Sequence, residues 1–71
     1  MTWNYRVMKR KNSEGDYEFG VYEVYYDEKG NVSSWTTKSL TPTCSSAEDL
    51  EHEMNVMMKA FKQETIEYKE E

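Results

Sequence analysis

The pattern of apolar and polar positions divides the chain into three strands followed by one helix. Residues 2–11 alternate between aromatic or apolar side chains and polar ones, the period of two that is typical of a half-buried strand. Residues 17–26 are rich in aromatic and β-branched side chains on both faces and predict the central strand of a small sheet. Residues 32–37 are shorter and more polar and predict an edge strand. Gly15 and Gly30 lie between these segments, where tight hairpin turns need them.

A helix is predicted over residues 46–63. Ser45 and Glu48 have the spacing of a capping box, in which the two side chains satisfy free backbone N–H groups at the helix start. Val56 and Ala60 lie off the apolar stripe of this helix, and we expect Val56 to be partly exposed. The stripe itself recurs at helical spacing and is expected to pack on the sheet: Ala47, Leu50, Met54, Met57, Met58 and Phe61. The opposite side is expected to point outward: Glu51, His52, Glu53, Asn55, Lys59, Lys62 and Gln63.

These elements predict one α+β domain over residues 1–71, with a three-stranded antiparallel sheet and one helix packed on one of its faces. The tail, residues 64–71, alternates again and can add a short fourth strand. With 71 residues the chain lies near the lower size limit for a domain that folds alone, so self-association or a partner would help to stabilise it.

The register decides which side chains share a face. A turn closed by Gly30 places Tyr26 opposite Val32, Val24 opposite Ser34 and Glu23 opposite Trp35. Pairing of Val7 with Val21 then puts a first set of side chains on one face, although a one-residue slip in the first hairpin would exchange the faces of residues 2–11. That set is Trp3, Tyr5, Val7, Phe19, Val21, Tyr25 and Trp35.

A single helix of about 18 residues, roughly 27 Å long and 10 Å wide, can cover one face of this sheet and not both. We therefore expect the second face to be an exposed aromatic patch that serves as an interface between molecules. A two-fold dimer, formed back to back or edge to edge, is the preferred assembly. The interface residues expected on this face are Met8, Tyr22, Val24, Tyr26 and Val32.

The net charge of −5, from 14 acidic and 9 basic residues, argues against direct binding of nucleic acid and against an anionic membrane surface. Four of the nine basic residues fall within residues 1–11, and the helical part is acidic. The chain has one cysteine, no apolar leader and no apolar run long enough to span a membrane, so we expect a cytoplasmic protein.

Candidate chemistry is sparse. Glu23 lies within an apolar strand and is a possible functional carboxylate, although it can equally pair with Arg6 or a lysine. His52 and Cys44 have no partner at catalytic or metal-ligating spacing. We therefore predict no enzyme, no catalytic residue, no metal and no cofactor.

Two resemblances can be stated. The segments Trp3-Asn4-Tyr5-Arg6-Val7, Glu23-Val24-Tyr25-Tyr26-Asp27-Glu28-Lys29-Gly30 and Ser34-Trp35-Thr36 resemble those of small uncharacterised bacterial proteins of about 70 residues. That resemblance implies the same order of strands and helix and no particular function. The three strands and Pro42-Thr43-Cys44-Ser45 before a capped acidic helix are similar to the N-terminal domain of HicB-type antitoxins, with Thr43 where that family has Gly.

Three functions remain open at this point. The first is a small interaction module that forms a homodimer through the sheet face or edge, or binds another protein. The second is an acidic inhibitor, antitoxin-like or phage-encoded, whose helix mimics phosphates and blocks a nucleic-acid-binding partner. The third is a small-molecule or enzymatic domain that uses Glu23 and the tyrosines.

Overall fold

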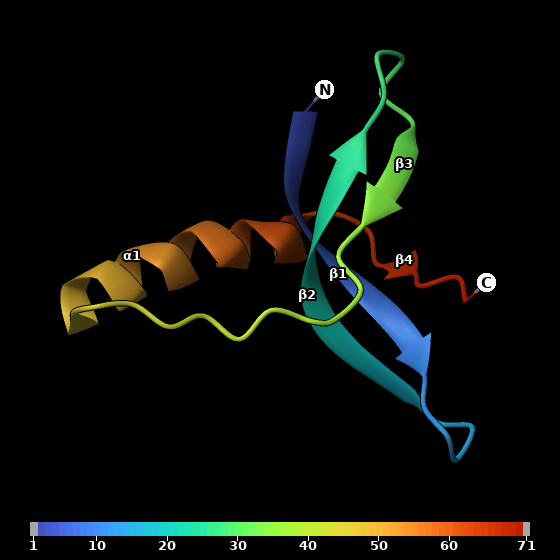
Figure 1. The fold of residues 1–71 in the computed structure, drawn as a ribbon, viewed down its shortest axis with the longest axis horizontal. Helices are drawn as coiled ribbons and strands as arrows, with labels where there is room; N and C mark the ends of the chain where they lie inside the picture. Colours follow the sequence, from blue (N-terminus) through green and yellow to red (C-terminus); the bar gives the residue numbers. More distant parts are fainter. Residues whose placement is uncertain (1, 71) are drawn as a thin grey trace.

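The structure is a computed structural model that describes residues 2–70, and it has the predicted α+β fold (Figure 1). The strand order in the sheet is β3-β2-β1-β4. β4 pairs in parallel with β1 at Met8 and Lys9, whereas the other pairs are antiparallel, so the sheet is mixed and the short fourth strand is confirmed. The elements are β1 Thr2–Lys11, β2 Tyr17–Tyr26, β3 Val32–Trp35, α1 Ala47–Met58, the 3₁₀ helix η1 Lys59–Lys62 and β4 Ile66–Glu67.

The first hairpin has the predicted register, with Val7 opposite Val21. Its turn is held by Asn12, whose Oδ1 accepts hydrogen bonds from the backbone N–H groups of Glu14 (2.9 Å) and Asp16 (3.0 Å). Gly15 has φ +87°, a conformation that residues with a Cβ rarely adopt. The slipped register is therefore not the one that the chain adopts.

The second hairpin departs from the predicted register after its first pair. Tyr26 faces Val32 as expected, but a β-bulge follows, so Tyr25 faces Ser34 and Val24 faces Trp35. The predicted pairs of Val24 with Ser34 and of Glu23 with Trp35 are wrong. Ser33 is the extra residue, and its hydroxyl donates to the carbonyl of Tyr25 at 3.1 Å. Because alternate residues of a strand point to opposite faces, the bulge moves Trp35 to the other face of the sheet.

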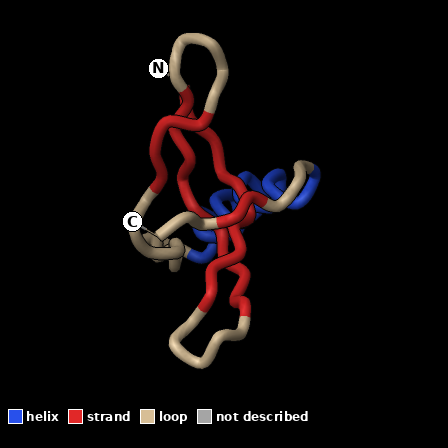
Figure 2. Tube along the Cα trace, turned by 90° about the vertical axis from the view of Figure 1, so that its right-hand side faces the viewer, coloured by secondary structure: helices blue, strands red, loops and turns tan. Residues whose placement is uncertain are grey.

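The helix begins one residue later than the capping box predicts. Ser46, not Ser45, is the N-cap, and its Oγ accepts from the backbone N–H of Asp49 at 3.1 Å. α1 runs to Met58 and tightens into η1, which ends at Lys62, close to the predicted end at residue 63. Figure 2 shows the helix on one side of the sheet, with the two hairpin turns at opposite ends of the molecule.

One interior lies between the sheet and the helix. Val7, Met57 and Ala60 are buried there, and η1 packs against β1. Val56 is partly exposed, as expected, but Ala60 is buried although it lies off the predicted stripe. The side of the helix that faces the sheet is therefore rotated from the predicted one, and of the predicted stripe Met57 alone is buried.

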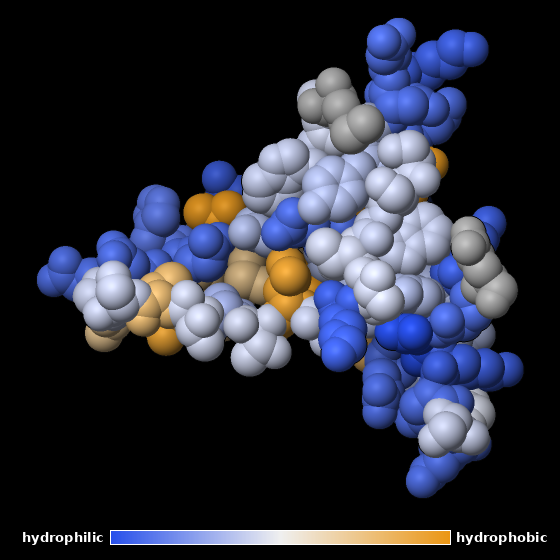
Figure 3. Space-filling model, viewed as in Figure 1, coloured by the Kyte–Doolittle hydropathy of each residue, from blue (hydrophilic) through white to orange (hydrophobic). Residues whose placement is uncertain are grey.

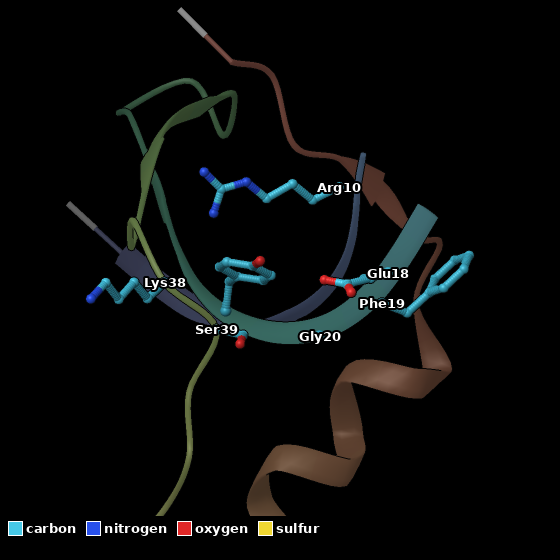
Figure 4. A pocket seen from close by; sticks show the side chains of 7 residues that line it. Arg10, Glu18, Phe19, Gly20, Lys38 and Ser39 are labelled. Atoms are coloured by element: carbon cyan, nitrogen blue, oxygen red, sulfur yellow. The ribbon is translucent and has the colours of Figure 1, made fainter. Parts of the chain in front are cut away.

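A second interior lies on the opposite face, and the expectation of an exposed patch there is wrong. Met8 and Val24 have no exposed surface, and Tyr22 is 5% exposed. The sheet curls around this face (Figure 4), and side chains from β3, β4 and the tail close it. Of the predicted interface residues, Met8, Tyr22 and Val24 are core, Tyr26 packs half-buried against them and Val32 is exposed. The covering side chains are Tyr26, Trp35, Ile66 and Tyr68.

Candidate functional site

The largest run of unpartnered apolar side chains lies on the helix and not on the sheet. We call it the helix stripe: Leu50, Met54, Met58 and Phe61, which are 36%, 45%, 58% and 67% exposed. The spacing of four, four and three residues places these side chains along one side of α1 and η1. That side adjoins the buried side that carries Met57 and Ala60, since Met57 lies three residues after Met54 and four before Phe61. The exposed fraction of the stripe rises steadily from Leu50 to Phe61.

The N-terminal part of the helix extends past the sheet. The first turns of α1 project away from the strands, and the connection after β3 runs beside them (Figure 1). Figure 3 shows hydrophobic atoms on this projecting arm between hydrophilic groups. The C-terminal end of the helix has the sheet opposite it, and there Met57 and Ala60 are buried. Met58 and Phe61 belong to the same turns but point to solvent.

Charge is divided between the two ends of the helix. Glu48 and Asp49 occupy the first turn of α1, with Glu51 following, and Lys59 and Lys62 occupy η1. All five side chains are exposed. This distribution also suits the helix dipole, which favours negative charge at the N-terminus and positive charge at the C-terminus.

The predicted functional carboxylate belongs to a second feature, which we call the acid–tyrosine cluster: Tyr5, Glu23, Tyr25 and Glu53. Tyr5 faces Glu23 across the first hairpin and donates to Glu53 Oε2 at 2.9 Å. Tyr25 donates to Glu23 Oε1 at 2.6 Å. Glu53 was expected to point outward, and Glu23 was expected to pair with a cation if it had no functional role. Within residues 2–70 the ion pair found joins Arg10 and Glu70 and does not involve Glu23. The side-chain partner of Glu23 is instead the hydroxyl of Tyr25.

The pKa values of both tyrosines in the cluster are raised by burial and by the neighbouring carboxylates. Burial, the hydrogen bond to Glu53 and the charges of Glu53 and Glu23 raise the pKa of Tyr5 to about 12. The hydrogen bond to Glu23, with burial and the charge of Glu23, raises the pKa of Tyr25. Each phenol therefore stays protonated and acts as a donor to its carboxylate.

A small cavity of about 140 Å³ adjoins the cluster, beneath the connection that leads from β3 to α1. Its lining consists of residues 40–44 of this connection together with Tyr5, Glu23, Glu53 and Met57. Cys44 is part of this lining and is an exposed free thiol. Among residues 2–70, no three His, Cys, Asp or Glu side chains are grouped closely enough to hold a metal ion. The hydrogen bond from Tyr5 to Glu53 makes the cluster a link between the sheet and the helix. A functional role for Glu23 stays a prediction.

A wider hollow, about 370 Å³, opens on the other face near the start of β2 (Figure 4). Arg10 points into it, but its guanidinium is already engaged. It pairs with Glu70, stacks 4.0 Å from the centre of the Tyr68 ring and donates to the carbonyl of Thr37 at 3.1 Å. These contacts hold the tail against the curled face of the sheet, and they occupy the guanidinium so that it is not free to bind a ligand in the hollow.

His52 and the acidic turn residue Asp27 lie apart from both features. His52 is exposed on α1. Asp27 Oδ1 accepts from the backbone N–H groups of Lys29 (2.9 Å) and Asn31 (3.0 Å), which makes it a turn residue. Sequence reasoning identified all four residues of the helix stripe but assigned them to the core. The signal that could have separated them is the apolar pair Val56 and Ala60, which gives the helix a second apolar side.

Comparison with family models, curated proteins and solved structures finds no match to this chain. The two resemblances noted from the sequence therefore stay predictions. No helix within residues 2–70 has both the length and the apolar character needed to cross a bilayer.

Proposed function

We propose that this chain is a small, non-enzymatic interaction module of the cytoplasm that self-associates through the helix stripe. The observation that carries the proposal is the exposure of Leu50, Met54, Met58 and Phe61 in one row. Large apolar side chains that gather on one surface are typical of sites where proteins associate. Methionine is also well suited to such surfaces, because its flexible side chain adapts to the shape of the partner.

The size of the two interiors supports self-association. Six hydrophobic residues are buried in the part of the chain that the structure describes, and they are divided between two faces of one sheet. A domain this small gains little stability from such interiors. Covering the stripe with a second copy would add apolar burial that the single chain lacks. The exposed thiol of Cys44 is suited to a reducing compartment, which supports the cytoplasmic assignment.

The acidic inhibitor remains the second candidate, and one observation favours it. Glu48, Asp49 and Glu51 lie exposed on the part of α1 that projects past the sheet, where a basic partner can reach them. The two proposals differ in the residues that they require. An inhibitor that mimics phosphates needs the three carboxylates, whereas self-association needs Leu50 and Phe61.

Sedimentation equilibrium from about 10 μM to about 1 mM tests self-association, because small interfaces give weak dimers with dissociation constants in this range. We expect the wild-type chain to dimerise and Leu50→Lys to stay monomeric. His52→Lys is the matched control, since it adds the same charge to an exposed position of α1 outside the stripe. Circular dichroism should show the same fold in all three proteins. A wild-type chain that sediments as a monomer throughout would contradict the proposal.

A further inference from the structure

We infer that the two copies pair with their α1 helices antiparallel, so that the projecting half of each helix covers the C-terminal half of the other. This inference rests on the proposed self-association and adds the orientation and the contacts. It follows from two independent properties of the helix: the symmetry of the stripe and the separation of its charges.

The helix stripe is nearly symmetric about its own centre. An antiparallel pair related by a two-fold axis places Leu50 against the partner's Phe61 and Met54 against the partner's Met58. The midpoints of both pairings fall close to residue 56, so one axis satisfies both. At 1.5 Å per residue the stripe spans about 16 Å, roughly three helical turns, which is enough for two helices to interlock.

The charges select this orientation over the parallel one. Glu51 lies three residues before Met54, and Lys62 lies four residues after Met58, so each adjoins the stripe on the same side. Antiparallel pairing brings Glu51 next to the partner's Lys62, twice in the dimer. Parallel pairing would instead leave Glu51 and the partner's Lys62 at opposite ends of the stripe, so neither attractive pair would form.

Disulfide trapping distinguishes the two orientations in the full-length chain. Cys44→Ser removes the native thiol, and Met54→Cys and Met58→Cys are introduced separately at exposed stripe positions. We expect the mixture of the two variants to cross-link under mild oxidation much faster than either variant alone. Faster cross-linking of Met54→Cys with itself would overturn the antiparallel arrangement and leave self-association standing.

Charge exchange provides a second measurement. We expect Glu51→Lys and Lys62→Glu each to weaken the dimer about tenfold, since two attractive pairs become repulsive, and the double variant E51K/K62E to regain the wild-type dissociation constant. His52→Glu, with a charge change away from the stripe, should leave it unchanged. Dimers of unaltered strength in both single variants would overturn the charge pairing. A wild-type chain that stays monomeric would overturn the proposed self-association as well as the antiparallel pairing. A wild-type chain that binds only a different protein would also overturn both.

Discussion

The hydroxyl of Tyr5 donates a 2.9 Å hydrogen bond to Glu53 Oε2, and this contact ties the middle of α1 to β1. It joins two residues that are 48 positions apart in the chain. Within residues 2–70 it is the side-chain hydrogen bond found between α1 and the strands, and the N-terminal half of α1 projects past the sheet. The orientation of α1, and with it the direction in which the stripe points, therefore depends in part on this hydrogen bond.

Tyr5→Phe should lower the free energy of unfolding by about 0.5–1.5 kcal/mol, the usual range for the loss of one hydrogen bond. The contact also predicts a dependence on pH. The pKa of Tyr5 is about 12 in the folded chain against 10 for an ordinary tyrosine, so its contribution to stability is complete below pH 10 and is lost as the pH rises towards 12. Urea unfolding at several pH values checks both points, and the loss of stability above pH 10 should be smaller in Tyr5→Phe.

Met8→Ala should lower the free energy of unfolding by about 2–5 kcal/mol, because it leaves a cavity in the second interior. Met58→Ala makes the same chemical change at a position that is 58% exposed, against 0% for Met8. In the monomer it should change stability by no more than about 0.5 kcal/mol. Denaturation at a concentration below the dimer range separates the two effects. Equal losses in the two variants would contradict the burial described for this face.

Ser46→Ala should cost about 0.5–2 kcal/mol, since Ser46 Oγ accepts from the N–H of Asp49 and caps the helix. Ser45→Ala is the matched control and should be nearly neutral. A capping box that began at Ser45 would reverse this order, so thermal unfolding of the two variants decides where the helix begins.

Gly20→Ala should destabilise the fold by about 1–3 kcal/mol through overpacking. A Cβ at this position would lie 2.8 Å from the Cβ of Ser39, in the connection that follows β3 beside β2. Ser39→Gly removes that atom, so the double variant G20A/S39G should recover most of the loss. Urea unfolding of the single and double variants measures the recovery. No recovery would show that the connection does not pass over Gly20.

The elements were predictable because local signals agree with one another. Alternation, turn glycines and an acidic helix start place three strands and one helix within a few residues of their observed bounds. The faces were predicted less well, for two separate reasons. The bulge at Ser33 has no strong local signal in a polar strand, so Trp35 was assigned to the wrong face. The helix has two apolar sides, and periodicity alone does not say which one meets the sheet.

The candidate site and the exposed surface were also predicted only in part, for similar reasons. Glu23 was recognised as an unusual carboxylate in an apolar strand, and its donor Tyr25 shares its face of that strand. The hydrogen bond from Tyr5 to Glu53 joins residues 48 positions apart and comes from packing that a sequence does not show. The exposed patch was expected on the sheet because one helix can cover only one face. Curling of the sheet and the return of Tyr68 to the other face supply a cover that this argument did not include.

Because Ser33 is an extra residue in the second hairpin, the second interior depends on the number of residues in that hairpin. Exchanging Ser33 for another small polar residue would preserve the pairing of Val24 with Trp35, whereas deleting it would turn the indole towards the helix and leave Tyr68 without its edge-on neighbour 5.7 Å away. Variation in the second hairpin should therefore be tolerated as substitution and resisted as insertion or deletion. We therefore expect the number of residues between Gly30 and Trp35 to matter more to this fold than their identity.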